Sequence, residues 1–312
     1  MCLIAIAWKV HPRFPLAVIA NRDEAHARPT AAAGFDPLHP DVYGGRDLAL
    51  GGGWLMGSTR GRLAAVTNVR TGPRPPDAPR SRGALVHGFA GGEAAALPWL
   101  ASLMPAAPLY GPFNLLAWDG EALGFASNHP QPGFKAVAPG MHAMSNGAFD
   151  AAWPKNTHAT QALEAWLASP LAEGSLDSAA LAPLLDALAE TAVAPDDALP
   201  DTGVGMELER ALSPPFVLGG AYGTRCSTVV LVEDSAITFM ERRFGPGGRC
   251  WASPTSGCRG RSAGDSRARA REARTKRRLS LRGLSLGWLS LPRQSCFSPT
   301  SVVATSAVLV FL

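Results

Sequence analysis

The sequence predicts an α+β domain built on antiparallel sheets. Its short apolar runs occur in pairs separated by turn residues, which is the pattern of β-hairpins rather than of repeated βαβ units. Segments with helical spacing lie between these pairs, so strands, helices and again strands follow one another along the chain. The 312 residues are enough for one large domain or two small ones, and 46% of them are hydrophobic.

Most of the predicted strands belong to four hairpins. The first joins the apolar run CLIAIAW to LAVIA, and the second and third turn at Arg60-Gly61 and Asp119-Gly120. An uninterrupted apolar run such as CLIAIAW is typical of a strand that is buried on both faces. The four hairpins cover residues 2–20, 54–68, 113–126 and 227–240.

Four segments are predicted to be helical. The third has apolar side chains that recur on one helical face, and Pro183 is suited to begin the fourth. Residues 26–53 and 70–82 are rich in Pro, Gly, Asp or Arg and are expected to be surface loops. The predicted helices are residues 85–89, 93–102, 156–168 and 184–188.

The composition of the chain changes abruptly at Arg249. Residues 249–312 carry 12 basic and 2 acidic groups, a net charge of +10, whereas the first 248 residues carry 17 and 23, a net charge of −6. We therefore expect a domain over residues 1–248 and a basic Ser/Arg-rich tail over 249–312 that is disordered or read in an altered frame. The alternative is a basic arm that binds membrane or nucleic acid. The acidic body itself gives no electrostatic support for nucleic-acid binding.

Several classes of protein do not fit the sequence. No stretch approaches the roughly 20 apolar residues of a membrane span, so stable membrane insertion is not expected. The short apolar N-terminal run lacks a basic leader, which favours a cytoplasmic location. The five cysteines form no CxxC pair and the seven histidines no HExxH or HxH spacing, so neither a metal site nor a required cofactor is predicted.

Cys2 is the candidate nucleophile. It follows Met1 directly and has a small side chain, so removal of Met1 would leave a thiol and a free α-amine on one residue. An α-amine has a pKa near 8 and can act as the general base for its own thiol. The alternative is a cysteine that only packs at the start of a strand.

Three polar residues follow the second apolar run of the first hairpin, and a hairpin brings them close to Cys2. Asp23 would orient the α-amine, and Arg22 would lower the pKa of the thiol or hold an anionic substrate, while Asn21 completes the group. The alternative for these residues is a capped turn with a surface ion pair.

Two asparagines and one arginine complete the candidate site. Asn68 and Asn146 each end a predicted apolar segment, where an amide can donate to a developing oxyanion. Arg225 precedes the last strand pair, where it would bind a carboxylate or phosphate. The alternatives are turn residues for the asparagines and a surface charge for the arginine.

Seven motifs together resemble the NRDE family, whose eukaryotic members are called transport and Golgi organisation protein 2. The resemblance covers residues 1 to about 245 in the same order and is highly specific. It implies a four-layer αββα sandwich of the N-terminal-nucleophile hydrolase type, in which two antiparallel sheets lie between helices. The motifs are MCLIAIAW, ANRDE, GGRDL, GGGWLMG, AAVTN, MSNGAFDAAWPK and YGTRCSTVVLV.

A weaker likeness to the bile-salt hydrolase and penicillin V acylase group assigns roles to residues. It implies Cys2 as nucleophile, Asp23 in its Arg-Asn-x-Asp motif and Asn68 and Asn146 as oxyanion donors, with Arg225 at the place of a late arginine. Ala20 stands where that group has the first arginine of the motif, so Arg22 is the neighbouring candidate. Asn21, Arg22 and Trp54 are expected to contact the substrate.

Two functions follow from these expectations. The first is an N-terminal cysteine hydrolase that cleaves an amide or thioester of a small acyl compound. The second is a non-catalytic carrier of haem or an acyl-coenzyme A in the same cavity, with Cys2 or a histidine as iron ligand, since eukaryotic relatives are linked to haem trafficking and to lipid or coenzyme A metabolism. Both require the predicted site residues to converge on one cavity.

Overall fold

The computed structural model of the chain describes residues 2–72, 78–250 and 308–311. Its strands form two antiparallel sheets, here called sheet A and sheet B. Sheet A has the order β10-β1-β2-β11-β12-β13, with β1 Cys2–Trp8, β2 Leu16–Ala25, β10 Gly140–Met144, β11 Tyr222–Val232, β12 Ile237–Arg243 and β13 Val308–Phe311. Sheet B has the order β3 to β9, with β3 Thr30–Phe35, β4 Val42–Asp47, β5 Gly53–Ser58, β6 Arg62–Asn68, β7 Phe113–Trp118, β8 Leu123–Ser127 and β9 Gly133–Ala136.

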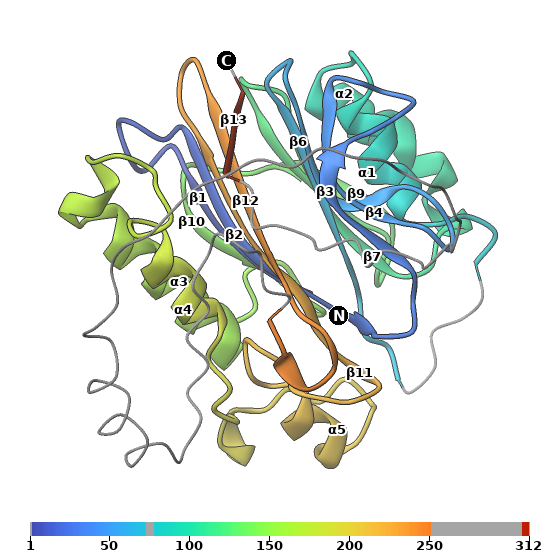
Figure 1. Cartoon of the computed structure of the whole chain (residues 1–312). Coiled ribbons are helices and arrows are strands. Elements are labelled where there is room, and N and C mark those ends of the chain that lie inside the picture. The colour runs from blue at the N-terminus through green and yellow to red at the C-terminus, as the bar shows by residue number, and fades with distance from the viewer. Residues whose placement is uncertain (1, 73–77, 251–307, 312) are drawn as a thin grey trace, which may run out of the picture.

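Helices cover the outer face of each sheet, so the fold has four layers (Figure 1). Helices α1 (Gly83–Ala90) and α2 (Ala96–Leu103) pack on sheet B, while α3 (Pro154–Leu167) and α4 (Ala182–Leu188) pack on sheet A. A short helix, α5 (Met206–Ala211), lies near the lower end of the view. The predicted αββα sandwich of two antiparallel sheets between helices is confirmed.

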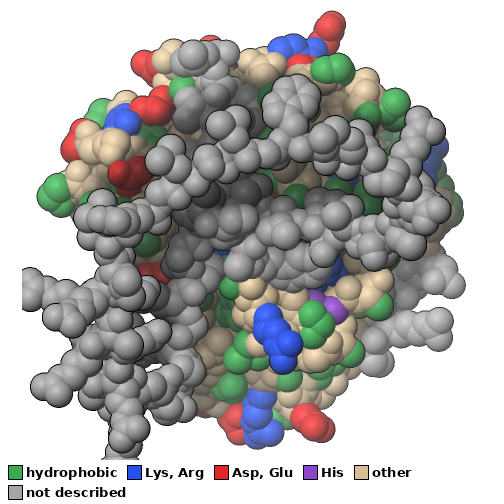
Figure 2. Space-filling model, viewed as in Figure 1, with side chains coloured by type: hydrophobic (Ala, Val, Ile, Leu, Met, Phe, Trp, Pro, Cys, Tyr) green, Lys and Arg blue, Asp and Glu red, His purple; other side chains and the backbone are tan. Residues whose placement is uncertain are grey.

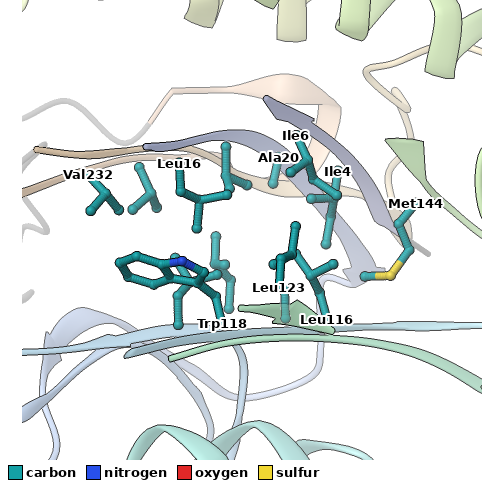
Figure 3. Close-up of a cluster of buried hydrophobic side chains, with 14 of the residues drawn as sticks. Ile4, Ile6, Leu16, Ala20, Leu116, Trp118, Leu123, Met144 and Val232 are labelled. Carbon is teal, nitrogen blue, oxygen red and sulfur yellow. The ribbon is translucent and has the colours of Figure 1, made fainter. Parts of the chain in front are cut away.

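A separate apolar core fills each space between layers, which explains why the first strand reads as a continuous apolar run. Successive side chains of a strand point to opposite faces. Ile4 and Ile6 of β1 therefore pack between the sheets against residues such as Leu116 (Figure 3), while Leu3 and Ala5 pack against the helices over sheet A. A third core joins sheet B to α1 and α2.

The hairpins β1–β2, β5–β6, β7–β8 and β11–β12 and all four predicted helices are present. The expectation of a long loop over residues 26–53 is wrong, because β3 and β4 lie within it and pair with each other and with β5. The edge strand β9, which is wholly exposed, and β10 were also not predicted. Exposed or half-exposed edge strands need no alternating apolar pattern, so the sequence carries little signal for them.

Most of the predicted tail lies outside the described residues, including all of 251–307. Residues Val308–Phe311 form β13, which pairs with β12 from Ile237↔Phe311 to Met240↔Val308. These four residues therefore add a strand to sheet A, which differs from the expectation of a tail without structure.

The described part of the chain contains no helix with the length and apolar character of a membrane span. On the face shown in Figure 2, the coloured Lys, Arg, Asp and Glu side chains occur in small groups, several of which mix both signs.

Candidate active site

Five of the predicted site residues line one cavity of about 350 Å³. Cys2 begins β1, Arg22 and Asp23 lie near the end of β2, and Asn68 ends β6. Trp54 is the second residue of β5 and lines the same space. The ends of strands from both sheets thus meet at one edge of the layer between the sheets, as the sequence predicts.

Cys2 is almost completely buried at this edge. It is the direct cross-strand partner of Arg22, and its carbonyl oxygen accepts a hydrogen bond of 2.9 Å from Ser145 Oγ. Burial raises the pKa of the Cys2 thiol, while the N-terminal ammonium of the chain and Arg22 act to lower it. The balance leaves the pKa above its usual value, so the thiol depends on a neighbouring base to become a nucleophile.

Asp23 lines the cavity and also contacts a polar side chain of the neighbouring strand β11. Its Oδ1 accepts a hydrogen bond of 2.6 Å from Thr224 Oγ1 on β11. Burial raises the pKa of Asp23, and the strongest opposing influences are the N-terminal ammonium and Lys155. Asp23 is thus a buried acidic group that lines the same cavity as Cys2.

The two asparagines hold different positions in one hydrogen-bonded unit. Asn146 is fully buried and donates from its Nδ2 to both the main-chain oxygen and the Oδ1 of Asn68, each at 3.0 Å. Within the described structure Asn68 Nδ2 has no protein partner, and Asn68 lines the cavity whereas Asn146 does not. The geometry thus leaves the Asn68 NH₂ group available to a ligand in the cavity, while Asn146 orients the Asn68 side chain.

Besides Asn146, two predicted residues lie outside the cavity lining. Asn21 faces the helices over sheet A, where its Nδ2 donates to the carbonyls of Leu188 and Pro215 and its Oδ1 accepts from Ser227 Oγ. Arg225 donates to the carbonyls of Ala25 and Arg28, at 2.8 and 3.1 Å. Both side chains stabilise the protein main chain, so the expected contact of Asn21 with substrate and of Arg225 with an anion does not match their positions.

The glycine run before Trp54 is explained by a close approach of two main chains at the cavity. Gly52 has a φ of +78°, and a Cβ there would lie 2.4 Å from the carbonyl carbon of Gly83 at the start of α1. Both Gly53 and Gly83 line the cavity. The GGGW motif therefore has a steric role, because glycine at position 52 lets the chain before β5 approach the start of α1.

Lys155 does not line the cavity but interacts electrostatically with Asp23, and sequence reasoning missed it. It lies in the first turn of α3, is buried, and donates from Nζ to the carbonyl of Leu212 at 3.2 Å. Burial lowers the pKa of Lys155 to about 8, and the charges of Asp23 and Cys2 oppose this shift. A signal was present in the sequence, because a lysine in the first turn of a helix is unfavourable for the helix dipole and indicates a partner elsewhere.

Arg80 and Arg82 were also missed, although both line the cavity. They precede α1 within the segment that was expected to be only a surface loop. Two arginines separated by one residue in a Pro-rich loop indicate neither a helix nor a strand. Only the fold therefore shows that Arg80 and Arg82 line the cavity beside Cys2.

The described residues contain no group of three or more His, Cys, Asp or Glu side chains placed to hold a metal ion. No described histidine lines the cavity, so Cys2 is the lining side chain that could serve as an axial ligand to haem iron.

Comparison with known proteins agrees with the motifs. A family model described as Transport and Golgi organisation 2 matches residues 1–246. The mouse Transport and Golgi organization 2 homolog is 31% identical over 258 residues, and the human homolog is 33% identical over 263 residues; each alignment covers 78% of this chain and 92% of the relative.

A solved structure of a mutant conjugated bile acid hydrolase from Clostridium perfringens aligns with a TM-score of 0.44 and 6% identity, over 77% of this chain and 88% of the other. A likeness of this size carries no argument about function. The family match over most of the chain and the identity to the mammalian relatives do decide the family. The chain belongs to the Transport and Golgi organisation 2 family.

Proposed function

We propose that this chain, once Met1 is removed, is an N-terminal cysteine hydrolase that cleaves an amide or thioester of a small acyl compound. One observation carries the proposal: Cys2 shares its cavity with the buried Asp23 and with the Asn68 amide, whose NH₂ group has no described protein partner. In the proposed reaction Cys2 is the nucleophile, Asp23 orients its base and Asn68 donates to the oxyanion.

The proposed reaction has two steps. The α-amine of Cys2 takes the thiol proton, the sulfur attacks the acyl carbon, and Asn68 Nδ2 donates to the oxyanion that forms. The ammonium then gives its proton to the departing amine or thiolate as the bond to the acyl carbon breaks. In the second step the α-amine takes a proton from water, the hydroxide attacks the acyl-enzyme, and the thiol is restored with release of the carboxylic acid.

The raised thiol pKa makes the α-amine essential to this proposal. A buried thiol without a base would remain protonated near neutral pH. In this proposal the negative charge of Asp23 attracts the protonated amine, and Lys155 interacts electrostatically with the same carboxylate.

The test compares two variants that remove different parts of the nucleophile. Cys2→Ala removes the thiol, and a bulky residue inserted after Met1 retains Met1 and masks the amine. Both should fold, as judged by circular dichroism, and both should lose turnover of an amide or thioester panel by at least about 10²–10⁴-fold. Intact mass establishes whether Met1 is absent from the native protein. Full turnover by Cys2→Ala would eliminate covalent catalysis.

A thiol-reactive reagent provides a second readout. Cys226 is buried, lies outside the cavity lining, and its thiol pKa is raised well above the usual value by burial and by Glu241. Iodoacetamide should therefore label Cys2 faster than Cys226, as measured by peptide mass spectrometry. Equal rates at both cysteines would contradict an activated Cys2.

The carrier function is a second proposal, and the burial of Cys2 favours it. A thiol with a raised pKa is a poor nucleophile, and the cavity wall combines charged groups with the apolar side chains of Leu50 and Trp54, as an acyl or haem ligand would require. Binding of haem or an acyl-coenzyme A by a native protein that turns over no amide or thioester would support the carrier.

A further inference from the structure

The cavity beside Cys2 is unusually rich in guanidinium groups. Its lining includes Arg22, Arg28, Arg80 and Arg82, together with three carboxylates, Asp23, Glu24 and Asp47. Four arginines at one small cavity produce mutual repulsion unless anions compensate them. The question is therefore which of the four are already paired.

Two of the arginines have partners within the protein. Arg28 Nε lies 3.2 Å from both carboxylate oxygens of Asp47, and its Nη2 lies 2.5 Å from Oδ2. Arg22 Nη2 lies 3.7 Å from Glu24 Oε2, and its Nη1 donates to Thr30 Oγ1 at 3.3 Å. These contacts use two of the three cavity carboxylates, and the third, Asp23, accepts a hydrogen bond from Thr224.

Arg80 and Arg82 are different. Neither makes an ion pair with a carboxylate in the part of the chain that the structure describes. Arg82 Nη1 donates to the carbonyl of Pro112 at 3.0 Å, which orients the guanidinium without neutralising it. The main chain of Arg80 is held by a bridge to Tyr110 and a hydrogen bond to the carbonyl of Leu109. The Arg82 guanidinium and the main chain of Arg80 are thus held at the cavity wall by neutral contacts.

Arg80, Arg82 and Cys2 line the same cavity of about 350 Å³, so one small ligand in it can contact all three. Arg82 is partly buried, which lowers its pKa, and the charge of Cys2 is the strongest influence that opposes this shift. Arg225, the arginine expected from the sequence to bind an anion, is occupied by two main-chain carbonyls.

We propose that the guanidinium groups of Arg80 and Arg82 bind an oxyanion, a carboxylate or a phosphate ester, on the same molecule whose acyl carbon Cys2 attacks. This inference rests on the proposed hydrolase function and names its substrate class: an acyl compound that carries an anionic group. Planar guanidinium forks match both anions. Leu50 and Trp54 on the same wall provide apolar contacts for the acyl part. A cavity of about 350 Å³ is of the size that encloses one small ligand.

The first test uses two alkylating reagents of nearly equal shape and different charge. Iodoacetate and iodoacetamide both form a bond from the Cys2 sulfur to carbon and release iodide, while the thiol proton passes to solvent. Only iodoacetate carries a carboxylate. The ratio of the two rates at Cys2 cancels changes in thiol nucleophilicity, so it reports recognition of the anion alone.

We expect Cys2 in the native protein to favour iodoacetate by about tenfold relative to a free thiol such as N-acetylcysteine, the factor that one charge-assisted contact can supply. Arg80→Gln and Arg82→Gln should each reduce this preference, and the double variant should abolish it. Arg80→Glu should reverse it. The matched control is Arg60→Gln, which removes an exposed arginine whose own partners are Asp41 and Gly91, outside the cavity lining.

The second test needs no reaction. Inorganic phosphate and succinate should each raise the melting temperature of the native protein above that in chloride of equal ionic strength, and the larger rise identifies the favoured anion. Cys2→Ala and Arg60→Gln should keep the rise, and the Arg80/Arg82 double variant should lose it. Since Arg80 is exposed, its variants should fold even if Arg82→Gln does not.

The results separate this proposal from the hydrolase function. Anion preference and stabilisation without turnover would contradict the hydrolase and retain the oxyanion site. Turnover of neutral and anionic amides or thioesters with equal efficiency, and an unchanged rate ratio and melting shift in the double variant, would overturn the oxyanion site and retain the hydrolase.

Discussion

Near its end, strand β2 carries polar residues on both faces, and the residues on the two faces make different contacts. Asn21 points toward the helices over sheet A, and all its amide hydrogen bonds go to protein groups. Arg22, the next residue, points between the sheets beside Cys2 and lines the cavity. Asp23 contacts both regions, through Thr224 and through the cavity. Two adjacent residues of one motif therefore have different roles, because successive side chains of a strand point to opposite faces. Asn21 supports the fold, whereas Arg22 lines the cavity.

Among the residues on the two sides of sheet A, we expect Asn68 in the cavity to have the largest effect on turnover. Asn68→Ala should reduce turnover of an amide or thioester substrate by about 10²–10³-fold, the loss typical of one oxyanion donor. Asn146→Ala should have a smaller effect, about tenfold, because Asn146 only orients Asn68. Steady-state kinetics on both variants measures the difference. A larger loss in Asn146→Ala would assign the donor role to Asn146 instead.

Lys155 lies on the helix-covered side of sheet A, and its burial should make the free energy of unfolding depend on pH. Its pKa is lowered from 10.5 to about 8 by burial. Between these values the unfolded chain binds a proton that the folded chain does not, so the free energy of unfolding should rise with pH from about 8 to 10.5, by up to about 3 kcal/mol. Lys155→Met should remove this rise in urea denaturation curves, and Lys135→Met, at an exposed lysine, should keep it. A rise retained in Lys155→Met would mean that another group causes it.

Asn21 should show the smallest effect, and on stability alone. Asn21→Ala leaves the carbonyls of Leu188 and Pro215 and the Ser227 hydroxyl without their partner, at a cost of about 2 kcal/mol in the free energy of unfolding. The ratio of iodoacetate to iodoacetamide labelling at Cys2 should not change. If that ratio fell while stability stayed constant, Asn21 would belong to the cavity after all.

Much of the fold was predictable from local patterns. The strands β1, β2, β5 to β8, β11 and β12 and the helix α3 are apolar at the period of their own geometry, because each buries at least one face in a core. The strands β3 and β9 lie at the edges of sheet B and show no such period. Their existence depends on pairing with a neighbour, which is a property of the assembled sheet.

The candidate site divides in the same way. The sequence by itself determined the family and indicated that Cys2, Asp23, Asn68 and Trp54 lie together, because each stands near the end of a predicted strand. Only the tertiary structure decided which polar side chains reach the cavity. It directed Asn21 and Arg225 to main-chain carbonyls and brought Lys155, Arg80 and Arg82 toward Cys2 from segments 78 or more residues away. The physical reason is that burial and hydrogen-bond partners assign each side chain its role, and both are set by elements distant in the chain.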